Sequence, residues 1–236
     1  MIPGTQDHRV PSVKALKQES TFGLNELLSG SGLRIEITSC GAIHAIRHGS
    51  SLINQFIPGP AEEGFFRLIL RWQTADGASG WAHLAGPTVA HRRTGPTSFE
   101  WTSVVAPGIA CSALLELHPN LTAWRWCTRL TNNSTESLLV DVLMAQDLGL
   151  ADEGAVRNNE AFNSQYIDLL PVEDDRLGWV ILARQNQSAH GGTHPWLAIG
   201  CEGGAAAYCT DAVQFFGDDH RHSGVPLAVR LSLIHI

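Results

Sequence analysis

Short stretches in which apolar and polar residues alternate recur along most of this 236-residue chain. Residues 33–38 alternate in this way, and the return segment 42–48 follows a turn at residues 39–41. A period of two on both sides of a turn predicts a β-hairpin in which each strand buries one face. The same pattern predicts further strands at residues 52–56, 65–72, 97–105, 109–117, 121–130, 138–144, 179–184, 196–201 and 205–210.

These predicted strands are distributed along the whole chain after an N-terminal leader. Residues 138–144 are almost continuously apolar, which predicts a strand buried on both faces. Residues 1–28 form the leader, with a short helix or a loosely held segment over 1–20 and a helical turn at 21–28 that opens at Asn25. The fold class expected is all-β, a large antiparallel β-sandwich over residues 29–236 with a short N-terminal helical leader.

Composition excludes several classes of protein. Apolar residues make up 44% of the chain, which is enough to build a core. The net charge of −7 argues against a nucleic-acid-binding protein, which needs a basic surface. The sequence contains no apolar run long enough to span a membrane and no signal peptide at its start, so a cytoplasmic location is expected.

The cysteines and histidines are weighed as metal or redox groups. The cysteines are odd in number, contain no Cys-x-x-Cys pair and fall mostly in predicted strands, where they are expected to be small buried hydrophobes: Cys40, Cys111, Cys127, Cys201 and Cys209. The pairs His190 with His194 and His220 with His222 have chelating spacing but sit among glycines, which favours flexible or solvated turns. No metal and no cofactor are therefore expected.

The segment of residues 146–168 departs from the strand pattern. It is much longer than the usual connection of about 4–6 residues. Planar polar groups and an aromatic ring suit sugar hydroxyls and a sugar ring, and they cluster here as Arg157, Asn158, Asn159, Glu160, Gln165 and Tyr166. These residues are predicted to bind substrate. The alternative, that they hold this domain against a neighbouring domain by hydrogen bonds, stays open.

Several stretches carry a family resemblance in their order along the chain: residues 31–37, 41–49, 52–56, 146–168, 214–217 and 224–226. Together they resemble the β-glucan phosphorylases of glycoside hydrolase family 94, chiefly 1,2-β-oligoglucan phosphorylases and the related part of cyclic β-1,2-glucan synthases. The resemblance implies the N-terminal β-sandwich domain, a galactose mutarotase-like supersandwich, of a larger inverting glycoside phosphorylase. In that family the catalytic acid lies in a downstream (α/α)6 barrel.

The resemblance also implies the partners of this domain. A β-glucan oligosaccharide and the missing catalytic barrel are expected, with inorganic phosphate as the co-substrate of the full-length enzyme. The β-1,2 linkage rests on the resemblance, so β-1,4 stays open, as does a homodimer. Residues 226–231 can form a strand, but residues 232–236 depart from the family pattern. We expect a truncated reading frame whose last residues are a cloning scar, with a native C-terminal strand as the alternative.

No catalytic residue is predicted in this chain. The adjacent carboxylates at 62–63, 152–153 and 174–175 do not converge, because neighbouring strand residues point to opposite faces. A free-standing carbohydrate-binding or mutarotase-like sandwich is the alternative function. It would need a histidine facing a carboxylate, for which the strand-adjacent candidates are His44, His118 and Glu116.

The tryptophans divide into two groups by their surroundings in the sequence. Trp72, Trp101 and Trp126 lie in predicted strands and are expected in the core or an interface. Trp81 and Trp196 lie near glycine or proline and are the better candidates for the surface, where an indole ring can stack on a sugar.

Overall fold

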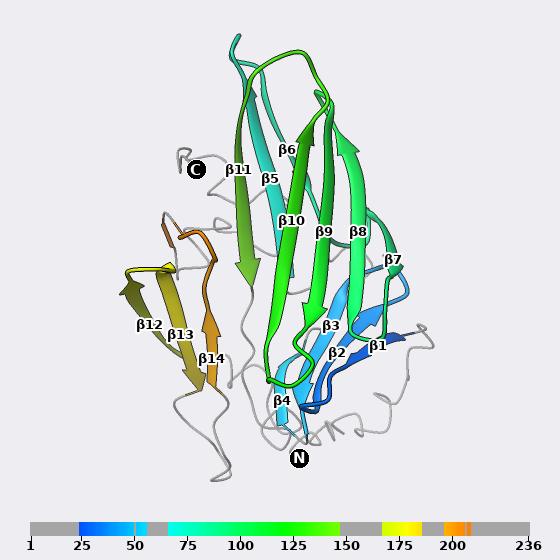
Figure 1. Ribbon diagram of the computed structural model, residues 1–236, viewed down its shortest axis with the longest axis vertical. Coiled ribbons are helices and arrows are strands. Elements are labelled where there is room, and N and C mark those ends of the chain that lie inside the picture. Colours follow the sequence, from blue (N-terminus) through cyan, green and yellow to red (C-terminus); the bar gives the residue numbers. More distant parts are fainter. Residues whose placement is uncertain are drawn as a thin grey trace, which may run out of the picture.

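The computed structural model describes residues 24–49, 51–55, 66–146, 167–185, 196–205 and 207–208. Within these residues the chain forms fourteen β-strands, β1–β14, arranged in four sheets with antiparallel pairing throughout (Figure 1). None of them is helical, so the all-β prediction is confirmed for this part of the chain. The helical leader predicted over residues 1–20 lies outside the described residues.

The first sheet is a meander in the order β1-β2-β3-β4, with the bounds Leu24–Leu28, Leu33–Thr38, Ile43–His48 and Ser51–Gln55. The predicted hairpin of residues 33–48 is confirmed as β2 and β3. The helical turn predicted at residues 21–28 is wrong for residues 24–28, which form β1. Leu27 explains the difference: it pairs with Ile35 and is fully buried, which a strand beside β2 allows.

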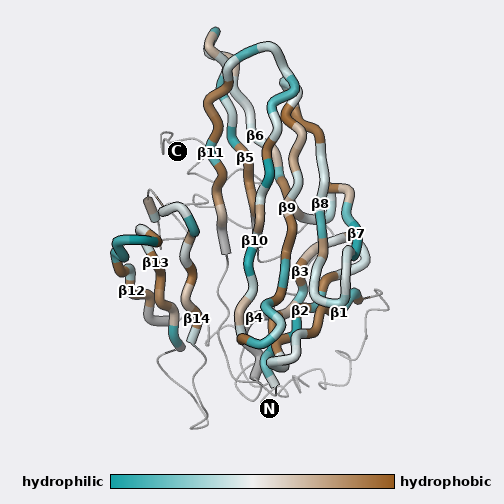
Figure 2. The backbone as a smooth tube through the Cα atoms, viewed as in Figure 1, coloured by the Kyte–Doolittle hydropathy of each residue, from teal (hydrophilic) through white to brown (hydrophobic). Residues whose placement is uncertain are grey.

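The second sheet has the order β10-β9-β8-β7, and the strands are Trp124–Asn132, Ile109–Leu117, Ser98–Val105 and Ala90–Arg93. The bounds predicted for β9 match the structure, and its residues alternate strictly between buried and half-buried positions. Figure 2 shows hydrophilic and hydrophobic positions succeeding one another along β10, the neighbouring strand. Each strand therefore turns one face to the core and the other outward.

The third sheet places β5 between β11 and β6, with the bounds Phe66–Thr74, Leu138–Gln146 and Ser79–His83. The prediction that residues 138–144 are buried on both faces is wrong, because Leu139 is 42% exposed and Met144 is 39% exposed. Among residues 138–144 the most buried is Asp141, whose carboxylate pairs with Arg71 on β5. An ion pair thus accounts for the charge inside an apolar run.

The fourth sheet has the order β12-β13-β14, and the strands are Ile167–Asp174, Gly178–Gln185 and Trp196–Ile199. β12 escaped prediction because it contains Pro171, which lacks a backbone N–H and is tolerated on an edge strand such as this one. The strand predicted at residues 205–210 is wrong at its described positions, since Ala205 makes only an isolated bridge with Gly178.

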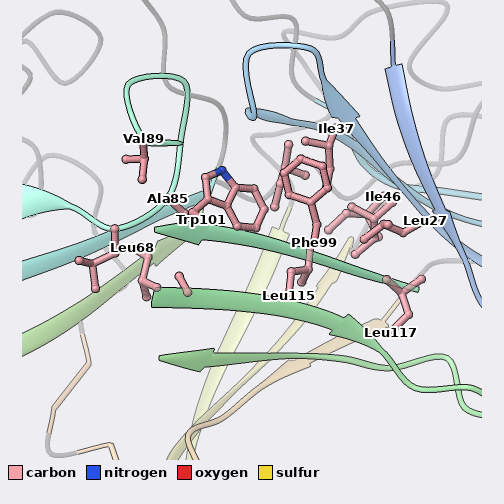
Figure 3. Close-up of a cluster of buried hydrophobic side chains, with 14 of the residues drawn as sticks. Leu27, Ile37, Ile46, Leu68, Ala85, Val89, Phe99, Trp101, Leu115 and Leu117 are labelled. Atoms are coloured by element: carbon pink, nitrogen blue, oxygen red, sulfur yellow. The ribbon is translucent and has the colours of Figure 1, made fainter. Parts of the chain in front are cut away.

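One hydrophobic cluster joins residues of all four sheets. Figure 3 shows Ile37 and Ile46 beside Phe99 and Trp101, with side chains of β5 and β9 completing the cluster. Trp101 is fully buried, and its indole N–H donates a hydrogen bond to the carbonyl oxygen of Gly41 at 3.0 Å. This bond ties the second sheet to the turn between β2 and β3.

The turn at Gly41 requires glycine. Its φ is +84°, and a Cβ atom there would lie 2.7 Å from Nδ1 of His91. Any side chain would therefore meet both backbone strain and a steric clash. The described residues contain no helix long and apolar enough to cross a membrane.

Candidate functional site

The residues predicted to bind substrate fall in one segment between two strands. β11 ends at Gln146 and β12 begins at Ile167. The predicted residues lie outside the described part of the chain, so their roles stay predictions: Arg157, Asn158, Asn159, Glu160, Gln165 and Tyr166. The structure does define the sheet end at which this segment joins β12.

At that end the antiparallel register places Asp168, Arg184 and Trp196 in one row across β12, β13 and β14. We call these three positions the Trp196 row. β12 begins, β13 ends and β14 begins at this end of the sheet, so residues 147–166 and residues 186–195 both connect to it. Two long connections of the chain are thus attached beside a carboxylate position, a guanidinium and an indole.

The contacts of the Trp196 row hold an aromatic ring at the surface. The guanidinium carbon of Arg184 lies 4.9 Å from the centroid of the Trp196 ring, within the range of a cation–π interaction. Trp196 is 63% exposed, whereas the next residue, Leu197, is only 8% exposed. Successive strand residues point to opposite faces, so Leu197 enters the core and Trp196 faces outward.

The tryptophan predictions are confirmed. Trp81 is 37% exposed and Trp196 is the most exposed of the tryptophans that the structure describes. Trp101 is fully buried, and Trp72 and Trp126 pack against the core. The signal that separated the groups is local: the core tryptophans lie inside alternating strands, while the exposed ones adjoin glycine or proline.

Two of the residues considered for mutarotase chemistry, His118 and Glu116, make local hydrogen bonds. His118 Nδ1 accepts hydrogen bonds from the backbone N–H groups of Asn120 at 3.2 Å and Leu121 at 3.0 Å. Glu116 accepts a hydrogen bond from Nε of Arg125 at 2.8 Å, and His44 lies in a different sheet. In the described part of the chain, these residues do not form the histidine–carboxylate pair that a mutarotase needs.

In the part of the chain that the structure describes, the most buried charged pair is Arg71 with Asp141, on adjacent strands of the third sheet. Arg71 Nε donates to Asp141 Oδ2 at 3.0 Å, and Asp141 is 9% exposed. Breaking such a pair by removing one partner costs about 3–5 kcal/mol. Its atoms are too enclosed to receive a substrate, so we interpret this pair as a structural link between β5 and β11.

The cysteine prediction holds at one position. Cys111 is buried, and this burial raises the pKa of its thiol. Cys127 and Cys201 are exposed, so the expectation that cysteines in the predicted strands are buried is wrong for these two. Cys40, which lies in the predicted turn, is exposed as well. Cys127 faces outward because it occupies an outward position of the alternating strand β10. Cys209 lies outside the described residues.

Metal-ligating groups do not gather in the described residues, where no group of three or more His, Cys, Asp and Glu side chains could hold a metal ion. The histidine pairs at residues 190 and 194 and at residues 220 and 222 lie outside these residues. We take the guanidinium of Arg184 and the exposed indole of Trp196 as the candidate binding groups of the described surface.

Comparison with known proteins agrees with the resemblance read from the sequence. A family model described as the SOGP N-terminal domain matches residues 36–233. The 1,2-beta-oligoglucan phosphorylase of Listeria innocua serovar 6a is 29% identical to the chain over 171 residues. The match covers 72% of this chain and 15% of that enzyme, so the chain corresponds to a small part of its relative's length.

Proposed function

The chain belongs to the SOGP N-terminal domain family, and on that premise we propose that it is a non-catalytic N-terminal module of a β-oligoglucan phosphorylase. The observation that carries the proposal is the family match over most of the chain, together with a phosphorylase relative of which only 15% is matched. A small matched share leaves most of such an enzyme to other domains, and we place its reaction centre there.

The reaction proposed for the whole enzyme is phosphorolysis of a β-1,2-linked gluco-oligosaccharide. Inorganic phosphate attacks the anomeric carbon from the face opposite the glycosidic oxygen, and a general acid protonates that oxygen as the bond breaks. The products are α-glucose 1-phosphate and a shortened glucan. The general acid belongs to an (α/α)6 barrel outside this chain.

The described carboxylates support a non-catalytic role. Glu100, Glu116 and Asp141 each form an ion pair with an arginine of the adjacent strand. Each of these carboxylates is thus engaged by an arginine within its own sheet, which supports a structural role for it.

The module has two roles in this proposal. Its sheets form a galactose mutarotase-like β-sandwich that docks on the barrel, and its segment at Arg157, Asn158, Asn159 and Glu160 borders the glucan site, with Gln165 and Tyr166 at its end. The enzyme acts in the cytoplasm, needs no cofactor beyond phosphate as co-substrate, and a homodimer would let the segment serve a neighbouring subunit.

A free-standing carbohydrate-binding domain is the second candidate. The exposed ring of Trp196 beside Arg184 favours it, because an open aromatic surface is a common feature of sugar-binding sites. The two candidates differ in one respect: a free-standing domain would bind its sugar without a catalytic barrel.

Domain replacement tests the proposed function. The matched segment of the Listeria innocua enzyme is exchanged for this chain, and phosphate-dependent release of glucose 1-phosphate from β-1,2-linked gluco-oligosaccharides is measured. Activity in the chimera supports the module role, with a deletion of the same segment as control. A chimera that melts cooperatively like the parent enzyme but releases no product argues against it.

A further inference from the structure

The Trp196 row breaks the usual pattern of an antiparallel sheet. Such a sheet commonly packs one face on the core and presents polar side chains to water on the other. The inner face of the fourth sheet follows this rule, since Ala183 is fully buried and Leu197 nearly so. Its outer face does not, because a large aromatic side chain at Trp196 is 63% exposed.

The ring at Trp196 is held in place although it is exposed. Arg184 lies directly opposite Trp196 in the strand register, with its guanidinium over the ring. Contact with a neighbouring side chain restricts the rotamers of the indole, so less entropy is lost when a ligand packs on it. Tryptophan is enriched at binding surfaces, where one end of its ring is apolar and the other end is polar.

The chemistry of the row fits one face of a pyranose ring. The C–H groups of a β-linked glucose unit can pack on the indole, and the guanidinium can donate hydrogen bonds to hydroxyl oxygens. The register puts Asp168 at the third position of the row. A hydrogen-bond donor and an apolar surface therefore lie next to each other at one end of the sheet.

We infer that the Trp196 row is a binding subsite for one glucose unit of a β-linked gluco-oligosaccharide. The choice of sugar rests on the proposed function, while the existence of the subsite rests on the exposed ring and its arginine. The subsite binds and does not react, so it would add affinity for longer glucans at a distance from the bond that is cleaved.

Nuclear magnetic resonance on the purified chain tests the inference. The chain has seven tryptophans, and each indole N–H gives one signal in a ¹H–¹⁵N correlation spectrum. The signal of Trp196 is identified by its loss in the Trp196→Phe variant. A β-1,2-linked glucotriose is titrated in, with cellotriose and glucose as comparison ligands. We expect the Trp196 signal to shift in a saturable way with the β-linked oligosaccharides.

Matched variants decide whether the ring itself binds. Trp196→Ala should weaken the glucotriose affinity by about tenfold or more, as loss of a central aromatic contact does. Trp81→Ala removes an exposed tryptophan of a different sheet and should leave the affinity unchanged. Trp196→Phe keeps an aromatic surface and should retain part of the binding. Melting temperatures confirm that each variant is folded.

Two results would overturn the inference. One is an unshifted Trp196 signal at saturating oligosaccharide. The other is an equal glucotriose affinity for the wild type and a folded Trp196→Ala variant. Release of glucose 1-phosphate by this chain alone would instead end the proposed function and leave the binding result standing. If changes at Trp196 abolish self-association while glucotriose does not bind, the row is a protein interface and the inference fails.

Discussion

The outer faces of two sheets differ in the residues that they present. The second sheet carries cross-strand ion pairs on its outer face, Arg92 with Glu100 at 2.7 Å and Arg125 with Glu116 at 2.8 Å. The fourth sheet presents large apolar side chains instead, among which the most exposed are Leu170 at 58%, Val172 at 39% and Trp196 at 63%. Figure 2 shows the accompanying run of hydrophobic positions along β13.

This difference cannot come from the inner faces, because both sheets contribute to the same core cluster. We attribute the difference to the surroundings of the two outer faces. A face lined with paired charges is suited to water, whereas contiguous exposed apolar groups mark a binding or docking surface. The outer face of the second sheet is therefore suited to solvent, and the exposed apolar side chains of the fourth sheet support the ligand that we propose at the Trp196 row.

The contrast between the outer faces is meaningful only if the second and fourth sheets share one core. Replacing a buried leucine of each sheet by alanine tests whether they do. Leu115→Ala in the second sheet should lower the free energy of unfolding by about 2–5 kcal/mol, since Leu115 is fully buried. Leu197→Ala should cost less within that range, because Leu197 retains 8% exposure. Urea unfolding should show one transition in both variants. A second transition, or no effect of Leu197→Ala, would mean that the fourth sheet folds separately.

A lysine introduced on the outer face of the fourth sheet should reduce self-association, whereas a lysine on the outer face of the second sheet should not. The purified chain is expected to self-associate at high concentration through the apolar part of the fourth sheet. Leu170→Lys should restore the monomer mass of 25.5 kDa in light scattering. Val104→Lys is the matched control: Val104 is 76% exposed on β8 of the charged sheet, and its replacement should change nothing. A wild type that stays monomeric and binds no apolar dye would contradict this account.

The ion pairs on the second sheet should contribute little to stability. The side chain of Arg92 is 73% exposed, so water and salt screen its interaction with Glu100. A double-mutant cycle with Arg92→Ala and Glu100→Ala should give a coupling free energy of about 0.2–1 kcal/mol that shrinks in added salt. A coupling several times larger and insensitive to salt would show that this face is covered.

The smallest effect is expected at the turn between β12 and β13. Backbone N–H groups of Leu177 and Arg176 donate to Asp174 and lower the pKa of its carboxyl below the usual 3.8. A lowered pKa stabilises the folded chain above the unfolded-state pKa, and this stabilisation is lost as pH falls through the folded-state pKa. The stability difference between wild type and Asp174→Asn, measured in urea, should stay constant above about pH 5 and narrow in acid. A difference that widens in acid would contradict the assignment.

The sequence was most informative where a strand has one buried face. Residues 109–117 alternate strictly, and the bounds of β9 follow from that pattern because the core selects every second side chain. β12 could not be predicted, because Pro171 argues against a strand unless that strand is known to lie at the edge of a sheet. β1 was assigned to a helical turn because its single buried residue, Leu27, leaves no period to detect.

The site was less accessible to sequence reasoning than the fold. Trp196 was singled out as a surface residue, but its partner Arg184 was not, because the register that brings them together is a property of the sheet. Composition alone pointed to Arg157 and its neighbours, which remain a prediction. Long-range pairing of strands therefore marks the limit of what the pattern of residues reveals here.

The central claim is that this chain is a non-catalytic module, and an assay of the purified chain tests it most directly. Wild-type protein is incubated with β-1,2-linked gluco-oligosaccharides and inorganic phosphate, and glucose 1-phosphate is measured, with the full-length Listeria innocua enzyme as the positive control. The account predicts no release by the chain at any concentration at which it is folded. Phosphate-dependent release of glucose 1-phosphate by the chain alone would contradict it.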